Sequence, residues 1–169
     1  MHIAGHYAAG VLPYTRLKNG QVLFLLGEDV RDCSFSDFGG KAERQDGCSS
    51  ELTAMRELQE ESFGLVLTET QLRNVFAAKS YTLLRGTTRA GHPYFCYCIE
   101  CPFQPHLASV ARKLLAFFKS KGIYKSLVEK TDFRWVTLHE LFSPQIPKRQ
   151  VFVNTIAANR AALEALAAS

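Results

Sequence analysis

The amino-acid sequence predicts a mixed α/β fold, in which helices pack against a central sheet. Two observations support this class. Strand-like segments stand on both sides of a helical segment at residues 50–62, and an Ala-rich helical segment closes the chain at residues 149–168. Strands that bracket a central helix are typical of layered α/β domains. The 169 residues, 47% of them hydrophobic, suit one core, so residues 1–169 are expected to form a single domain.

Three strand-like segments precede the central helix, at residues 4–17, 21–30 and 34–41. The first two are rich in apolar side chains, and the turn Lys18–Gly20 between them is typical of a hairpin. The third segment ends in paired glycines. Chain breakers and hydroxyl groups then favour a helix from Ser50 to Ser62, which Gly64 is expected to stop.

The rest of the chain alternates between strand-like and helical segments. Strands are expected at residues 76–86, at residues 92–103 and from residue 132, and helices at residues 107–122 and 149–168. The first two strands flank a polar turn, as in a hairpin. The helix at 107–122 has an apolar stripe of Leu114, Phe117 and Phe118, with basic side chains elsewhere.

Charge is distributed unevenly along the chain. The net charge is +4, but residues 1–101 carry 10 basic and 12 acidic side chains, whereas residues 102–169 carry 10 basic and 4 acidic ones. A basic half beside an acidic helix suits a polyanionic substrate whose charge is also met by a metal ion. A solvated basic surface explains the same charges equally well.

Composition argues against a disulfide framework and against a membrane span. The five cysteines are an odd number, and Cys96 and Cys98 share one face of an expected strand, so buried thiols are favoured over structural zinc. No segment has the roughly 18 continuous apolar residues that cross a bilayer, and the N-terminus lacks a secretory signal pattern. We therefore expect no membrane partner and an intracellular location, in the cytoplasm, with the nucleus as the alternative.

The helix at 50–62 gathers like charges on one side. Glu57, Glu60 and Glu61 fall within about 100° of arc on an ideal helix, and Arg56 stands four residues before Glu60. Like charges at this spacing destabilise a helix unless a cation offsets them. Three carboxylates suit Mg²⁺ or Mn²⁺, which complete their shells with water and phosphate oxygen, better than Ca²⁺. A solvent-exposed acidic face of an unrelated domain is the alternative.

The sequence "GGK" at residues 39–41, followed by "RELQEESFGL" at 56–65, resembles the box of the Nudix hydrolase family. The resemblance covers residues 39–65, and "RWVTLHEL" later in the chain is similar to the family's Trp-containing strand. It implies the Nudix fold, an α/β/α sandwich with a mixed central sheet. It also implies a metal-dependent hydrolase that uses water to cleave the diphosphate bond of a nucleoside diphosphate linked to another moiety.

The resemblance assigns roles to individual residues. Glu57, Glu60 and Glu61 would hold Mg²⁺ or Mn²⁺, with the Gly40 carbonyl as a further ligand. Arg56 would orient the carboxylates, so that Arg56, Glu57 and Glu60 form the catalytic set. In this family the general base is either a helix glutamate or a carboxylate from elsewhere in the chain. The candidates are therefore Glu57 and, as alternatives, Glu129, Asp132 and Glu100.

The sequence departs from the family pattern in the loop before the helix. Seven residues separate Gly40 from Cys48, where the family has five, and Cys48 stands in place of the first glutamate of the box. Glu43 and Glu51 are the candidates to replace that glutamate. Two residues rather than one also separate Glu61 from Gly64, which lengthens the turn after the carboxylates.

Substrate choice is left open among several classes. Lys41, beside the glycines, is a candidate phosphate contact, with an exposed lysine as the alternative. Tyr81 lies near the position of a tyrosine in the family's dinucleoside polyphosphate hydrolases, although a tyrosine on a strand more often serves packing. Nucleotide sugars, oxidised nucleotides, diphosphoinositol compounds and capped RNA also remain candidates.

Two further functions compete with nucleotide hydrolysis. The segment Arg112–Lys130 carries six basic residues interleaved with Phe117, Phe118 and Tyr124, which suits RNA binding by an mRNA-decapping hydrolase. An amphipathic helix whose aromatic side chains face the core is the simpler interpretation. The third hypothesis is a catalytically inactive Nudix-fold module that binds nucleotides. A homodimer is an assembly that many members of the family form.

Overall fold

The computed structural model describes residues 6–169, apart from the side chains of residues 125 and 126. Within this range the strands are β1 (Ala8–Arg16), β2 (Val22–Asp29), β3 (Phe35–Ser36), β4 (Phe38–Lys41), β5 (Thr82–Thr87), β6 (Pro93–Glu100) and β7 (Lys130–Thr137). The helices are η1 (Arg44–Asp46), α1 (Ser50–Ser62), α2 (Glu69–Ala77), α3 (Leu107–Ser120), α4 (Tyr124–Leu127), α5 (Leu138–Phe142), α6 (Gln150–Ala158) and α7 (Arg160–Ala168).

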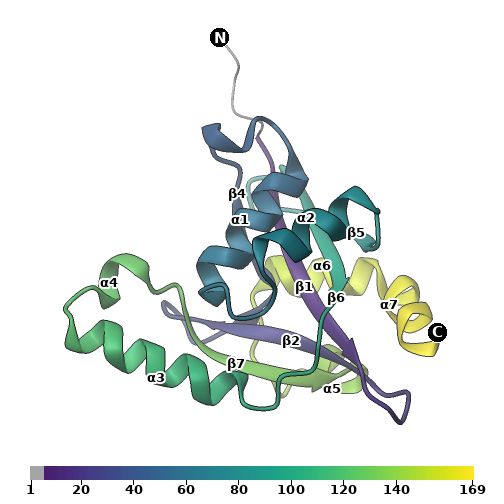
Figure 1. Ribbon diagram of the computed structural model, residues 1–169. Helices are drawn as coiled ribbons and strands as arrows, with labels where there is room; N and C mark the ends of the chain where they lie inside the picture. The colour runs from purple at the N-terminus through teal and green to yellow at the C-terminus, as the bar shows by residue number, and fades with distance from the viewer. Residues whose placement is uncertain (1–5) are drawn as a thin grey trace.

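Strand β1 is the centre of the sheet. It runs parallel to β6 and antiparallel to two strands on its other side, β4 along its first half and β2 along its second half. Strand β5 extends the sheet beyond β6, and β3 and β7 both pair with β2. The sheet is therefore mixed, and the glycine-containing strand β4 lies directly beside its central strand (Figure 1).

Helices cover both faces of this sheet. Because side chains alternate along a strand, Ala9 and Val11 of β1 pack under α1, α2 and α3, whereas Ala8 and Leu12 pack under α5, α6 and α7. Figure 1 shows α1 and α2 on one side of the sheet and α6 and α7 on the other. The predicted α/β class and the α/β/α sandwich with a mixed sheet are confirmed.

The central helix forms where the sequence predicts it. Ser49 caps its N-terminus by accepting a hydrogen bond from the Leu52 N–H group at 3.2 Å. The helix ends at Ser62, and the chain reverses through Phe63 (φ 56°) and Gly64 (φ 67°), both in the left-handed region. The Phe63 ring packs on Phe118, so tertiary contacts offset the strain of this phenylalanine.

Two predicted elements have different boundaries in the structure. The strand expected at 76–86 begins only at Thr82, because the Thr68–Gln71 capping box starts helix α2, which includes Phe76 and Ala77. Of the first strand, expected from residue 4, residues 4 and 5 lie outside the described residues.

The single helix expected at 149–168 is wrong, because it is divided into α6 and α7 at Asn159. The Asn159 side-chain amide donates to the Thr155 carbonyl at 2.8 Å and to the Arg85 carbonyl of β5 at 2.9 Å. An asparagine that bonds backbone groups in this way competes with helix continuation.

The cysteines of β6 serve the core. Cys96 and Cys98 are both fully buried in the layer that α6 and α7 cover, and burial raises the pKa of each thiol well above its ordinary value. The prediction of buried thiols is thus confirmed. Across residues 6–169, none of the helices is long and apolar enough to span a membrane.

The close approach of β1 and β4 gives a test of the fold. A Cβ atom at Gly10 would lie 2.6 Å from the Phe38 carbonyl oxygen and 2.7 Å from the Tyr94 hydroxyl, so Gly10→Ala should destabilise the protein by about 2–3 kcal/mol. Gly20→Ala is the control. Its Cβ meets nothing within 4 Å, but its φ of 83° should cost about 1 kcal/mol. If urea denaturation shows that Gly10→Ala and Gly20→Ala lower the free energy of unfolding equally, the packing argument is contradicted.

Candidate functional site

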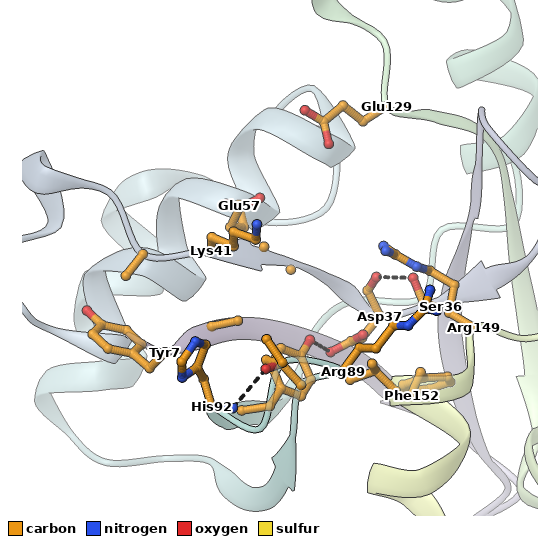
Figure 2. Close-up of a pocket in the computed structure, with 18 of the residues that line it drawn as sticks. Tyr7, Ser36, Asp37, Lys41, Glu57, Arg89, His92, Glu129, Arg149 and Phe152 are labelled. Carbon is orange, nitrogen blue, oxygen red and sulfur yellow. Dashed lines mark hydrogen bonds between the residues drawn. The ribbon is translucent and has the colours of Figure 1, made fainter. Parts of the chain in front are cut away.

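The candidate site is a pocket of about 890 Å³ at the end of the sheet where β4 meets α1. The helix contributes Arg56, Glu57 and Glu60, and β4 contributes its glycines and Lys41. Other lining residues come from the β5–β6 turn, from the start of α6 and from the loop before β7; they include Arg89, His92, Arg149, Phe152 and Glu129 (Figure 2).

Arg56 ties the parts of this site together. Its Nε and one terminal nitrogen bind the two oxygens of Asp46 at 3.0 and 3.1 Å, and that nitrogen also donates to the Lys41 carbonyl at 3.0 Å. The other terminal nitrogen lies 2.8 Å from Glu57 and 3.0 Å from Glu60. One guanidinium thus joins the loop, the strand end and the acidic face of the helix.

Glu57 lies against the backbone of Gly40. A Cβ atom at Gly40 would stand 2.5–2.7 Å from all three carboxyl atoms of Glu57, so only glycine leaves room for this carboxylate. Glu57 is only 8% exposed, and this burial raises the pKa of its carboxyl to about 7, against the opposing effect of Arg56. A carboxylate that loses hydration in this way favours a cationic partner.

Glu61 lies deeper, behind β4 rather than on the pocket surface. One carboxyl oxygen accepts the Gly39 N–H group at 2.8 Å, and the other lies 3.7 Å from the ammonium of Lys130, which is fully buried. Lys130 also donates to the Ser36 hydroxyl at 2.8 Å. Burial raises the pKa of the Glu61 carboxyl, and Lys130 opposes that effect. Glu61 therefore joins α1 to β4 from the interior of the protein.

The remaining predicted residues divide into two groups. Glu60, Lys41 and Glu129 are exposed and line the same pocket as Glu57. Tyr81, Asp132 and Glu100 do not line it: the Tyr81 hydroxyl donates to Glu51 at 3.0 Å, Asp132 faces Arg112 at 3.6 Å, and Glu100 borders a smaller pocket beside β1. The structure thus gathers six of the predicted residues, Gly40, Lys41, Arg56, Glu57, Glu60 and Glu129, around one cavity.

Asp46 anchors Arg56 from the loop before α1. It is 3% exposed, and besides Arg56 it accepts hydrogen bonds from the Thr53 hydroxyl and the Glu43 N–H group, both at 2.8 Å. Although burial opposes ionisation, these hydrogen bonds lower the pKa of Asp46. Of the two expected substitutes, Glu43 lies 3.6 Å from Arg56, and Glu51 bonds to Tyr81 instead.

The opposite side of the pocket was not foreseen from the sequence. It is formed by Arg89 and His92 from the β5–β6 turn, Arg149 and Phe152 at the start of α6, and Arg31 after β2. In Figure 2, Arg89 and His92 lie along the lower edge of the pocket, below Glu57 and Glu129. These residues are far apart in the sequence, so only the fold brings them together.

The carboxyl group of Asp37 lies at the floor of the pocket. It is buried and accepts a hydrogen bond from the Tyr94 hydroxyl, and burial raises its pKa. A Cβ atom at Gly39 would stand 2.6 Å from the same hydroxyl. The glycines of β4 therefore have a packing reason as well, because Tyr94 fills the space that a side chain at Gly39 would need.

Oxygen donors of the type that Mg²⁺ and Mn²⁺ bind lie around Gly40. Glu57 and Glu60 supply carboxylate oxygens on the pocket surface, and hard divalent cations of this kind need few protein ligands because water and phosphate complete their shell. Among the described residues, no three His, Cys, Asp or Glu side chains converge as a ready-made ligand group. Arg56 instead stands between Glu57 and Glu60.

The basic segment Arg112–Lys130 is only partly available to a ligand. Phe118 packs edge-to-face on Phe63 and Lys130 is buried, so neither fits an RNA-binding surface. Phe117 is 52% exposed, with the Lys121 ammonium 5.7 Å from its ring centroid. The expected apolar stripe is thus wrong for Phe117, because α3 turns Leu107, Ala111 and Leu115 toward the core.

Comparison with known proteins identifies the fold. No family model matches the sequence, and no curated protein sequence matches it. Solved structures do match. A Nudix hydrolase from M. smegmatis, RenU, is 14% identical, with a TM-score of 0.55 over 98% of this chain and 92% of that chain. The likeness shows that the chain has the Nudix fold.

Two other similar structures carry bound or named nucleotides. The Nudix domain of Shewanella oneidensis NrtR, complexed with ADP ribose, is 16% identical, with a TM-score of 0.55 over 96% of this chain and 90% of that chain. A C. elegans Ap4A hydrolase, in a binary complex, is 17% identical, with a TM-score of 0.55 over 94% of this chain and 98% of that chain. At such identities the likeness concerns the fold alone.

The burial of Glu57 predicts a dependence of stability on pH in the absence of divalent cations. Its pKa is raised in the folded state from 4.5 to about 7, so its contribution to stability is full below about pH 4.5 and is lost as the pH rises through about 7. Glu57→Gln should recover up to roughly 3 kcal/mol of that loss. Urea denaturation in EDTA at about pH 5 and pH 8 measures how much the free energy of unfolding falls between the two pH values. Glu69→Gln, a substitution of an exposed residue, should leave that decrease unaltered.

The anchoring by Asp46 can be tested separately. Asp46→Asn keeps the shape but removes the buried charge that faces Arg56, and should destabilise the protein by about 2 kcal/mol. Glu43→Gln in the same loop, with a side chain 56% exposed and 3.6 Å from Arg56, should change stability by less than about 0.5 kcal/mol. If the two variants unfold at the same urea concentration, Asp46 is not the anchor.

Proposed function

We propose that the protein is a Mg²⁺- or Mn²⁺-dependent hydrolase that cleaves the P–O–P bond of a nucleoside diphosphate linked to another moiety. Water is the nucleophile, and the products are two phosphate-bearing fragments. The Nudix fold and the residues gathered around the pocket support this proposal. The arrangement of Glu57 over Gly40, with Glu60 beside it, is the observation that carries it most directly.

The contacts around Arg56 explain how the carboxylates would be presented to a cation. Arg56 holds Glu57 and Glu60 on the pocket surface while its other nitrogens are fixed by Asp46 and Lys41. Glu57, Glu60 and the Gly40 carbonyl would hold the cation, with Glu61 supporting them from below. When bound, a divalent cation of this kind polarises a phosphoryl oxygen and acidifies a water molecule.

The general base would come from one of two sides of the pocket. Glu57 is placed beside the proposed cation, and Glu129 reaches the same cavity from the loop before β7. Asp132 and Glu100 lie outside this cavity, so the geometry favours the other two. Lys41 is exposed at the pocket edge beside Gly40, where its ammonium can contact a substrate phosphate.

The substrate we propose is a nucleotide or a nucleoside diphosphate derivative. The similar structures named above include an Ap4A hydrolase and a domain complexed with ADP ribose, and Ap4A and ADP ribose both contain phosphoanhydride bonds. A cavity of about 890 Å³ is within the size range of small-molecule sites, so it can admit a moiety on each side of a diphosphate.

RNA decapping is a second candidate, supported by the exposed ring of Phe117 on α3, which lies beside Lys121 at the end of that helix. It requires RNA binding that weakens with salt and with the loss of Lys119 and Lys121. The third candidate, a nucleotide-binding module without turnover, is supported by the NrtR domain and its bound ADP ribose. This candidate requires that the protein binds a nucleotide and releases no hydrolysis product.

Turnover in the presence of metal separates these candidates. ADP ribose, Ap4A and capped RNA should be incubated with the protein and Mg²⁺ or Mn²⁺, and the products identified. We expect metal-dependent cleavage of a P–O–P bond that falls by about 100-fold or more in Glu60→Gln, because one ligand of the cation is lost. Glu69→Gln, which changes a distant surface pair, is the matched control.

Three outcomes would decide against the main proposal. Binding without product in either metal supports the module. Cleavage of capped RNA alone, together with salt-sensitive RNA binding, supports decapping. Turnover that is equal in Glu60→Gln and the wild type removes the assigned carboxylates from the reaction.

A further inference from the structure

We propose that the pocket contains a second anion subsite, formed by Arg89 and Arg149 on the side opposite Glu57, which binds a phosphate group separate from the scissile diphosphate. The inference rests on the proposed function for the position of that diphosphate. It goes further by naming a substrate class: nucleoside diphosphate derivatives that carry an additional phosphate monoester.

Charge around Asp29 is the first observation. This carboxylate is 1% exposed and is bound by both Nε and a terminal nitrogen of Arg31, at 3.0 and 2.9 Å. Arg149 stands 3.4 Å from the same carboxylate. Two guanidinium groups therefore share this one buried carboxylate, Arg31 through two hydrogen bonds and Arg149 through a single longer contact. The side chain of Arg149 remains 40% exposed and lines the pocket.

Arg89 is the second observation. It lies on the tight turn between β5 and β6, which is closed by hydrogen bonds between Thr88 and His92. None of the ion pairs among the described residues includes Arg89, whereas Arg31, Arg56 and Arg149 all face carboxylates. An exposed arginine on an ordered turn that lines a cavity is suited to bidentate recognition of phosphate.

The distribution of charge across the pocket is the third observation. Glu57 and Glu60 come from α1, whereas Arg89 comes from the β5–β6 turn and Arg149 from the start of α6 (Figure 2). A diphosphate held by a divalent cation and Lys41 already has its charge met on the acidic side. Arg89 and Arg149, which come from other elements than α1, would then be available to a second anion of the substrate.

Apolar side chains line the same part of the pocket as Arg149. Val151 and Phe152 at the start of α6 line it next to Arg149. A ligand that spans the pocket would place its nucleoside or other uncharged part there. This combination of an apolar surface and a few convergent polar groups is typical of small-molecule sites.

The experiment compares ligands that differ by one phosphate. NADP⁺ and NAD⁺ differ by a ribose 2′-phosphate, and coenzyme A and dephospho-coenzyme A differ by a 3′-phosphate. Affinities should be measured calorimetrically with Mg²⁺ at low ionic strength, in a Glu60→Gln background that suppresses turnover. We expect the phosphorylated member of at least one pair to bind about tenfold more tightly.

Arginine variants then test whether Arg89 and Arg149 cause the preference for the phosphorylated ligand. Arg89→Ala and Arg149→Ala should each reduce it to about threefold or less, whereas Arg73→Ala, in an exposed helical ion pair outside the pocket, should leave it unchanged. Arg89 lies on an exposed turn, so its variant tests the subsite even if Arg149→Ala is destabilised through Asp29.

Several results would overturn the subsite. They are absence of a preference in both pairs, failure of the phosphorylated ligands to bind, a preference that survives both arginine variants, and equal weakening of both members of a pair. The last would mean that the arginines bind the diphosphate itself. Wild-type turnover is measured in parallel. If the wild-type protein shows no turnover but still prefers the phosphorylated ligand, the result contradicts the proposed hydrolysis and not the subsite.

Discussion

The interaction between Arg56 and Asp46 is the constraint on which the rest of the site depends. Asp46 holds the guanidinium through two hydrogen bonds, and the remaining donors reach the Lys41 carbonyl, Glu57 and Glu60. The loop before α1, the end of β4 and the acidic face of α1 are therefore fixed by one side chain. Because both partners are largely buried, loss of either would leave an uncompensated charge in the interior.

The packing around this pair concentrates negative charge that the fold alone does not need. Glu57 and Glu61, four residues apart on the same face of α1, are both buried. Burial raises the pKa of both carboxyl groups. Lys130 offsets Glu61 from inside the protein, and Arg56 offsets Glu57 from the side. Such an arrangement reduces stability near neutral pH, and a cation that binds the folded state would restore it.

Local patterns in the sequence predict the fold class and the acidic half of the site, because these depend on spacing within one helix. Ser49 and the positions of Glu57 and Glu60 follow from helical geometry. Asp46 was not predicted, because its contact with Arg56 joins the loop before α1 to the helix and follows no short-range pattern. The roles of Arg149 and Lys130 depend on which strands and helices become neighbours, and Asn159 ends α6 through a bond to β5. No short-range pattern carries that information.

The central claim is that these carboxylates bind a divalent cation, and a Mn²⁺ titration followed by electron paramagnetic resonance tests it most directly. Bound Mn²⁺ loses the sharp signal of the free aqueous ion. The account predicts that the wild-type protein lowers the free Mn²⁺ signal and that Glu57→Gln does so much more weakly, because Glu57 lies against Gly40 at the proposed cation position. A free Mn²⁺ signal that the wild-type protein leaves unchanged would contradict it.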